Sequence, residues 1–433
     1  MQRISLFAIA LFLLMTIVNP LYAQSNPLVI RLDKEKTVTL ALQESEDFKI
    51  AENQTDIVRQ QYKETIATLY PQVSGESSWT NNVHYAGANI QDYDVNTSIS
   101  VNQILWTFGR ISSALKVARK AILVSSLDKD TVRQEIAFIA KQSYYATLFA
   151  KETFSTVEVS YKNAISNKAI LEERSSKGRV SKRDNIKISA DIAARVPQVN
   201  NARVQLKSMV NTLKTIIGAQ YDAELELSES FSETYPLYKY DELEEKLFRY
   251  EPSLQSFEAN VKLKKIAIKQ KIADYFPYLS AFASYLYKGS DDSAVLGSGN
   301  IDSYGLVGVK VNVPIFTGGA TTAQVKQSKI DKEIAELQLQ KKKKALVLKL
   351  RNTVSEYNEF VENLKANNNA VKLAEESFVF FQELFASGKI SVIDLNDAEL
   401  QLTAQKLARL QTLFNINVTF AKIEKFTKME GVE

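Results

Sequence analysis

The stretches "SSKGRVSKRD" (175–184) and "FASGKISVID" (385–394) follow one pattern and lie 210 residues apart. Each has a glycine, then a cation, an apolar residue, a serine and, three positions later, an aspartate. Glycine just past a helix is the commonest way for a helix to end. The pattern therefore predicts the same turn twice, which indicates that the chain is internally duplicated.

The duplication is visible in further segments that match at nearly constant offsets. "ATLYPQVSG" (67–75) matches "ADYFPYLSA" (273–281) at an offset of 206, and "SVNQILWTFG" (100–109) matches "KVNVPIFTGG" (310–319) at 210. The four extra residues fall in 288–302, a polar, glycine-rich stretch that indicates a loop. We therefore divide the chain into three parts after its first 23 residues: a first repeat (24–217), a linker (218–250) and a second repeat (251–433).

Each repeat contains one long run without glycine or proline, 110–177 in the first and 320–387 in the second. Both runs are rich in Ala, Leu, Lys, Glu and Gln, which favour helices. One unbroken helix of this length would reach roughly 100 Å, which suits a coiled coil, a membrane protein or a repeat protein. Apolar and small residues recur at steps of three and four, as in coiled coils. We interpret these runs as helices packed side by side in a wall, with an ordinary long helical hairpin as the alternative.

Before each long run the hydrophobic period changes from 3.6 to 2. Val95, Thr97, Ile99 and Val101 alternate with polar residues, and 307–313 repeats the alternation with four valines. The segments 72–81 and 278–287 alternate less cleanly. The pattern predicts two strands in each repeat, within 71–106 and 277–316.

The four predicted strands are long enough to cross a membrane. A tilted strand needs about 9–11 residues for this, and apolar–polar alternation with aromatic residues at the strand ends is typical of an outer-membrane barrel. A strand of a water-soluble sandwich also alternates. Four strands cannot close a barrel without leaving backbone groups unpaired. The sequence therefore favours an oligomer, and three copies, giving twelve strands, over two.

Composition excludes several classes of protein. Without cysteine the chain forms no disulfide, thiolate metal site, cysteine nucleophile or lipidated N-terminal Cys. The formal net charge of +4 is spread along the chain, which argues against nucleic acid as a partner; we interpret Lys341–Lys344 as a solvated helix face. His84, the only histidine, falls in a polar loop. No phosphate loop or catalytic constellation appears, so we expect no enzyme, cofactor or metal site.

The first 23 residues predict a secretory signal peptide. Arg3 precedes an apolar run over 4–18, and Leu21-Tyr22-Ala23 offers a cleavage site. This order of charge, apolar run and small residues is typical of exported proteins. We therefore expect export and exclude this segment from the fold.

Four motifs resemble those of the TolC-like outer-membrane efflux channels: "LYPQVSG" (69–75), "FPYLSAF" (276–282), "VPIFTGGATTAQV" (313–325) and "GKISVIDLNDAEL" (388–400). The resemblance implies a mostly α fold with a small β part. Duplicated helix–strand–strand–long helix–helix units would form a trimeric α-barrel tunnel under a shared 12-stranded transmembrane β-barrel, with 218–250 as an equatorial region. Gly178 and Gly388 would mark the far tips of two helical hairpins.

The same resemblance implies a location and partners. The protein would lie in the cell outer membrane with a large periplasmic extension, in contact with outer-membrane lipid. It would be the passive exit duct of a tripartite efflux or type I secretion system. Its partners would be two further copies, a periplasmic adaptor protein and an inner-membrane pump of RND, ABC or MFS type. Cargo and pump class stay open. A secreted or periplasmic coiled-coil adaptor or adhesin without a pore is the alternative.

Asp394 and Asp397 are the strongest candidate functional pair. A spacing of three places both on one helical face, and the resemblance implies that this face forms an acidic ring at the tunnel tip. Asp394 has a second interpretation, because Ser391 and Asp394 form a capping-box pattern that Ser181 and Asp184 repeat. Asp397 has no such interpretation, since a lysine replaces it in the first repeat.

The resemblance also implies a tip lock, and here the sequence departs from the family. Related channels carry a Tyr three residues before the glycine and an Arg two residues after it, both bonded to the acid that matches Asp184. In this chain those positions are Phe385 and Ile390, which cannot hydrogen bond through their side chains. Either apolar packing closes the tip, or Lys389 replaces the Arg, or the lock is weaker. The turns at Gly178, Arg179 and Gly388 are the expected adaptor-docking sites.

Overall fold

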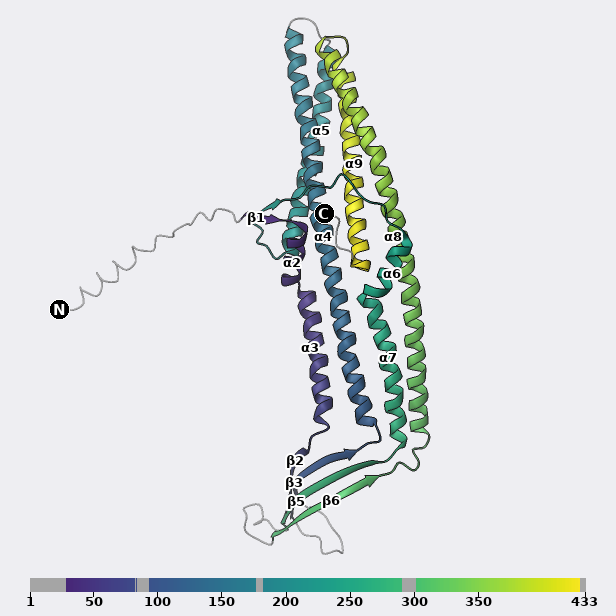
Figure 1. Cartoon of the computed structure of the whole chain (residues 1–433). Helices are drawn as coiled ribbons and strands as arrows, with labels where there is room; N and C mark the ends of the chain where they lie inside the picture. Colours follow the sequence, from purple (N-terminus) through teal and green to yellow (C-terminus); the bar gives the residue numbers. More distant parts are fainter. Residues whose placement is uncertain (1–28, 82, 84–92, 177–181, 290–300, 429–433) are drawn as a thin grey trace, which may run out of the picture.

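The computed structural model describes residues 29–81, 83, 93–176, 182–289 and 301–428. Its two longest elements are α4 (Arg110–Ser176) and α8 (Ala320–Ala386), helices of 67 residues each that run along an elongated molecule (Figure 1). They occupy the two predicted runs without glycine or proline. The predicted signal peptide (1–23), His84 and the turn residues Gly178 and Arg179 lie outside the described residues.

The remaining long helices pack beside these two in a single layer (Figure 1). Near the sheet, α3 (Glu46–Ala67) packs on α4, α4 on α7 (Pro252–Ile272), and α7 on α8. Towards the other end, α5 (Lys182–Ile216) packs on α4, while α9 (Val392–Thr427) packs on both α4 and α8. The layer therefore has α3 and α5 along one edge and α8 along the other, which confirms the expected mostly helical fold.

Short elements lie near the middle of the layer. The strand β1 (Val29–Leu32) pairs in parallel with β4 (Glu224–Leu227), and α2 (Lys34–Glu44) packs on α4. The segment after β4 crosses the layer to α6 (Tyr240–Tyr250), which packs on α8 and α9 (Figure 1). The linker thus joins the two repeats by crossing the helical layer (Figure 1).

One end of the molecule is a four-stranded antiparallel sheet of order β2-β3-β5-β6 (Figure 1). Its strands are β2 (Gln72–Asn81), β3 (Tyr93–Trp106), β5 (Tyr278–Gly289) and β6 (Ile301–Asn312); the one-turn helix η1 (Ala273–Tyr275) precedes β5. Strands are present in all four stretches where alternation predicts them. Within the described residues, β2 and β6 each pair on one side only.

The register separates the two faces of the sheet. Val73 lies opposite Val101, and Ala281 opposite Val309, so the β-branched residues share one face. Val307 on this face is 85% exposed. The other, mostly polar face borders a hollow of about 590 Å³ against α3 and α4. The polar face is therefore the hollowed one, as in a barrel whose lumen is polar.

Buried apolar clusters lie at several levels along the layer. The largest is central and includes Leu350, Tyr357 and Ile416; another lies at the end opposite the sheet. Among the described residues, none of the helices combines the length and apolar character needed to cross a membrane. The molecule is thus held together by side-by-side helix packing.

Candidate functional site: the tip of the helical hairpins

The turn between α8 and α9 forms the tip, by which we mean the end of the layer opposite the sheet. Gly388 has φ +75°, a left-handed conformation that glycine adopts without steric cost. The Lys389 N–H donates to the Leu384 carbonyl (2.9 Å) and the Gly388 N–H to the Phe385 carbonyl (3.0 Å). These two bonds make a Schellman motif. They explain why a glycine occupies this position.

Asp394 caps the start of α9. The Ser391 hydroxyl accepts from the Asp394 N–H (3.3 Å), while the Asp394 carboxylate accepts from the Ser391 N–H (3.1 Å) and from the Ser391 hydroxyl (2.7 Å). The bonds from Ser391 hold the pKa of Asp394 below its ordinary value, because they stabilise the charged form. The capping interpretation of Asp394 therefore has a direct geometric basis.

Asp397 lies one turn further along the same exposed face of α9. Both aspartates border a shallow hollow of about 240 Å³ against Ala374, Ser377 and Phe381 of α8. The buried side of this part of α9 carries Leu395, Asn396, Glu399 and Leu402. The structure therefore brings the two carboxylates together on one solvent-facing surface, as their spacing predicts.

Three of the four predicted gate residues line a second hollow, of about 310 Å³. Asp184, in the first turn of α5, lines it together with Phe385 and Ile390. Phe385 is 4% exposed and belongs to an apolar cluster with Leu171 and Val392, while Ile390 packs against that cluster. Lys389 is exposed.

Arg174, in the last turn of α4, is a tip residue that the sequence reasoning missed. Its guanidinium donates to the backbone carbonyls of Phe385 (2.8 Å) and Ala386 (3.1 Å), and it lies 4.5 Å from the centre of the Phe385 ring. A cation is favoured at the C-terminus of a helix. Arg174 thus connects the end of α4 to the end of α8 and ties the two hairpins together. Arg174 and Phe385 are 211 positions apart in the sequence, so no local sequence pattern predicts their contact.

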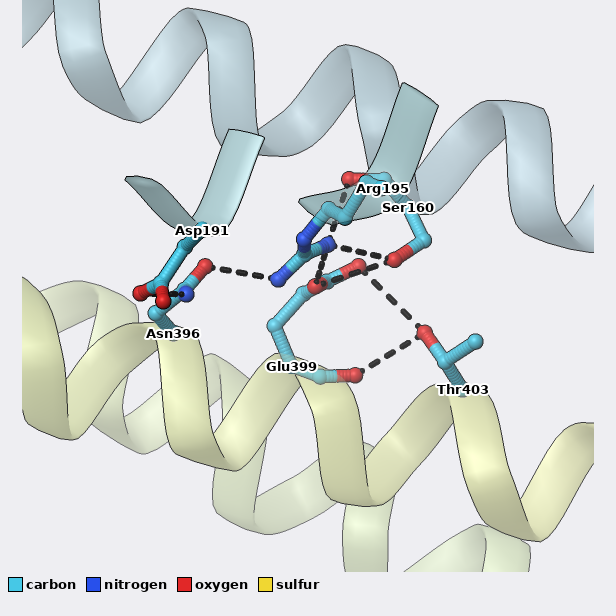
Figure 2. Close-up of polar contacts among 6 residues, drawn as sticks. All are labelled: Ser160, Asp191, Arg195, Asn396, Glu399 and Thr403. Atoms are coloured by element: carbon cyan, nitrogen blue, oxygen red, sulfur yellow. Dashed lines mark hydrogen bonds and ion pairs between the residues drawn. The ribbon is translucent and has the colours of Figure 1, made fainter. Parts of the chain in front are cut away.

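A buried polar network joins the hairpins further from the tip (Figure 2). Arg195 of α5 forms an ion pair with Glu399 of α9 (2.5 Å) and donates to Asn396 (2.7 Å) and to the backbone carbonyl of Ser160 on α4 (2.9 Å). The side chains of Arg195 and Glu399 are only 4% and 3% exposed.

Further bonds complete this network. Glu399 accepts from the hydroxyls of Ser160 (3.1 Å) and Thr403 (3.4 Å), and Asn396 donates to Asp191 (2.9 Å) (Figure 2). A buried charge is tolerated only when it is paired and hydrogen-bonded. The network therefore fixes how α4, α5 and α9 sit relative to one another.

The part of the chain that the structure describes contains no group of three or more His, Cys, Asp or Glu residues placed to hold a metal ion. The candidate site is therefore a set of structural contacts and surface carboxylates at the end of four helices.

The sequence profile of the outer membrane efflux protein family matches residues 37–219 and 245–423. The chain belongs to this family, and it is an efflux channel protein of the outer membrane. The resemblance to TolC-like channels is thereby confirmed.

Two curated relatives cover most of the chain. It is 21% identical over 408 residues to the probable outer membrane lipoprotein SilC of Salmonella typhimurium, covering 94% of this chain and 86% of SilC. It is 22% identical over 373 residues to TolC of Escherichia coli, covering 84% and 76% of the two chains. A crystal structure of CusC superposes with a TM-score of 0.77 at 18% identity, covering 91% of each chain. The fold is therefore that of these channels.

The buried ion pair predicts a large loss of stability when one partner is removed. We expect Glu399→Gln to lower the free energy of unfolding by about 3–5 kcal/mol, because Arg195 would keep a buried, unpaired charge. The double variant Arg195→Met/Glu399→Gln should lose less than the sum of the losses in Arg195→Met and Glu399→Gln, because the two residues interact directly. Thermal unfolding in detergent, followed by circular dichroism, measures this. Glu336→Gln, at the partly exposed Lys332–Glu336 pair, is the matched control and should cost under about 1 kcal/mol. Full additivity at the buried pair would contradict the prediction.

The Asp394 cap predicts a pH-dependent contribution to stability. The pKa of Asp394 is lower in the folded protein than the ordinary value of about 3.9. Its stabilisation is therefore present above that value and is lost as the pH falls through the folded pKa. Wild type should be more stable than Asp394→Asn at pH 6, with the gap in thermal midpoint closing below about pH 4. In a Ser391→Ala background the gap at pH 6 should shrink. A gap independent of pH would show that the charge of Asp394 is irrelevant to the cap.

Proposed function

We propose that three copies of this chain form the passive exit duct of a tripartite efflux or type I secretion assembly. One observation carries the proposal: the layer has two open edges, and each runs from a sheet edge into a helical edge. Strand β2 continues the edge formed by α3, and β6 continues the edge formed by α8. Joining unlike edges of successive copies makes a closed ring when the rotation from one copy to the next is a whole fraction of a turn, as it would be with three copies. Twelve pooled strands form a barrel wide enough for water, whereas eight would fill with side chains.

The two helical edges near the tip are complementary in charge. Exposed cations lie along α5 at Lys182, Lys187, Arg203 and Lys207. The facing edge would be α8, whose second half carries exposed carboxylates at Glu356, Glu359, Glu362, Glu375, Glu376 and Glu383. Each edge also exposes apolar side chains, Ile186 and Val204 on α5, and Val379 and Phe380 on α8. Opposite charges steer association and set its register, which supports an α5-to-α8 contact between copies.

We further propose that Asp394 and Asp397 contribute to an acidic ring at the tip. In a trimer whose axis faces this surface of α9, six carboxylates would lie around the opening. Rings of carboxylates attract cations and select for them in pores. The exposure of both aspartates on one face supports this role, and the capping bonds of Asp394 are compatible with it.

The tip is held closed, in this proposal, by apolar packing and by Arg174 in place of the polar lock of related channels. Phe385 and Ile390 supply the packing, and Arg174 replaces the hydrogen bonds that their side chains cannot make. Lys389 is exposed and does not line the gate hollow, so we do not assign it the role of the Arg in related channels. Asp184 borders the same hollow and completes the gate.

The partners follow from the same proposal. A periplasmic adaptor would dock at the hairpin turns, which include Gly178, Arg179 and Gly388, and an inner-membrane pump of RND, ABC or MFS type would supply the energy. The barrel would contact outer-membrane lipid. The duct itself catalyses no reaction and needs no cofactor. Membership in the efflux family favours this duct over a pore-less adaptor or adhesin.

The acidic ring predicts block by polyvalent cations. Purified wild type should migrate as a trimer on mild gels and conduct in planar bilayers, and trivalent cobalt hexammine added on the tip side should reduce its conductance. Asp397→Ala should weaken this block at least about tenfold. The substitution removes one carboxylate from each of the three copies, and each carboxylate attracts the trivalent cation. Glu356→Ala, which removes a carboxylate far from the tip, is the control. Equal block in wild type and Asp397→Ala would refute the ring, and a monomer without conductance would refute the duct.

The Arg174 contact predicts a leakier tip when it is removed. Arg174→Ala deletes two charge-assisted hydrogen bonds, each contributing about 1.5–3 kcal/mol. We therefore expect a higher single-channel conductance or longer open periods in bilayers than for wild type. Lys168→Ala removes another cation of α4, whose ion pair with Glu172 stays within that helix, and should change the conductance less. The same recording for Arg174→Lys tests whether charge alone suffices. Closed behaviour equal to wild type in Arg174→Ala would remove Arg174 from the gate.

A further inference from the structure

The joint between the two repeats inside one chain has the same kinds of element as the two open edges of the layer. In this in-chain joint, β3 pairs with β5 and α4 packs on α7. The open edges are formed by β6 with α8 and by β2 with α3. At an offset of 210 residues β6 and α8 match β3 and α4, and at an offset of 206 β2 and α3 match β5 and α7. The in-chain joint is therefore a template for a joint between two copies.

Side-chain exposure shows which surface the open edges leave uncovered. All ten residues of β2 are exposed, whereas most of the matching residues of β5 are at least partly buried. Ser256 of α7 is 6% exposed and donates to Asp128 of α4 (2.6 Å), whereas its counterpart on α3, Ile50, is 64% exposed. Leu337 of α8, next to the counterpart of Asp128, is 58% exposed. A second copy would therefore cover on β2 and α3 what β3 and α4 cover on β5 and α7.

The register of the in-chain joint, transferred to the open edges, predicts which residues meet between copies. Ile99 of β3 lies opposite Tyr285 of β5. Their counterparts are Val309 of β6 and Trp79 of β2, so the template places Val309 opposite Trp79 of the next copy. Both residues are exposed on the β-branched face of the sheet. Each joint then pairs a β-branched residue with an aromatic ring, a combination that stabilises neighbouring strands.

On the polar face, the same register brings opposite charges together. Ser100 lies opposite Ser284 within the chain, with their hydroxyl oxygens 3.0 Å apart. The counterpart pair is Lys310 and Ser78 of the next copy, and Glu76 of that copy lies diagonally from Lys310, within reach of a long side chain. Lys310 and Glu76 are both exposed, and among the described residues neither has an ion pair or a side-chain hydrogen bond. Charge complementarity therefore supports the transferred register.

We propose that a second copy binds along β6 and α8 in this transferred register, with Lys310 of one copy in an ion pair with Glu76 of the next. The inference rests on the proposed duct and names the residues by which one copy recognises another. The counterparts of Lys310 and Glu76 in the in-chain joint are Ser100 and Phe282, which carry no charge. The ion pair therefore belongs to the joint between copies alone, where opposite charges set the register and disfavour wrong pairings.

Engineered cysteines test the register, because the chain has none of its own. Directly opposite residues of antiparallel strands have Cα atoms about 4.5–5.5 Å apart, a distance that a disulfide spans. Diagonal neighbours, at about 7–8 Å, lie beyond its usual reach. Under copper phenanthroline, Lys310→Cys/Ser78→Cys should therefore form a covalent trimer on denaturing, non-reducing gels. It should do so at least about tenfold faster than the diagonal pairs, in which Glu76→Cys or Thr80→Cys replaces Ser78→Cys.

Charge reversal tests the ion pair. Glu76→Lys and Lys310→Glu should each lower the temperature at which the trimer dissociates on mild gels, because like charges would then face each other across the joint. The combined variant Glu76→Lys/Lys310→Glu should recover most of this loss. The matched control is Glu76→Lys/Lys344→Glu, which has the same net charge but reverses an exposed lysine of α8 instead, and it should recover none.

Every outcome of these two experiments decides the inference. Faster cross-linking at a diagonal pair, or no cross-linking of any pair in variants that assemble, overturns the register. If the single reversals do not assemble, the return of the trimer in the combined variant is the readout. No recovery there, or equal recovery in the Lys344→Glu control, overturns the ion pair. These results leave the duct intact, whereas a wild-type protein that forms no conducting trimer overturns the proposed function on which the inference rests.

Discussion

The outer edges of β2 and β6, which have no pairing partner among the described residues, are the constraint on which the rest of the architecture depends. In hydrocarbon each unpaired N–H or C=O costs several kcal/mol, so this sheet is stable in a membrane only when other chains complete it. Because each strand is connected to a long helix, the same constraint applies to the helices. Chain order links α3 to β2, β3 to α4, α7 to β5 and β6 to α8, and the helices lie in the order of the strands to which they connect. Any association that pairs β2 with β6 therefore also brings the α3 edge against the α8 edge. Pairing of β2 with β6 in the membrane would thereby also close the layer of helices into a ring.

A single layer of long helices needs a different kind of core from that of a compact domain. Even an inner helix such as α4 has neighbours on two sides and open faces on the other two, so apolar burial in the layer is divided among separate clusters along its length. Apolar contacts alone would tolerate a slide of one helix past another by one turn, about 5.4 Å. The Arg195–Glu399 network does not, because such a slide would leave a buried charge without its partner. We therefore interpret this polar network as the feature that sets the relative height of the two hairpins.

Local patterns predicted those parts of the structure that depend on local sequence. The absence of glycine and proline predicted α4 and α8, alternation predicted the strands, and the serine–aspartate spacing predicted the cap that Asp394 makes. Arg174, Arg195 and Glu399 were not predicted as site residues. Each looks like an ordinary surface charge in its own helix, and each acquires its partner only when helices about 200 residues apart in sequence are packed together. Phe385 was predicted in part. The sequence showed that its side chain cannot form the polar lock, but it did not show that Arg174 bonds to the Phe385 backbone.

Comparing the two repeats separates two kinds of position. Gly388 and Asp394 have identical counterparts 210 residues earlier, whereas Arg174, Arg195 and Glu399 correspond to Leu384, Gln405 and Ser189. A turn or a cap is made within one hairpin, so both copies of the repeat can use the same residue. A contact between the hairpins joins two non-equivalent surfaces, so it requires complementary residues and therefore different ones in each repeat. At these positions, divergence between the repeats marks contacts between the two halves of the chain, whereas the retained positions build each half alone.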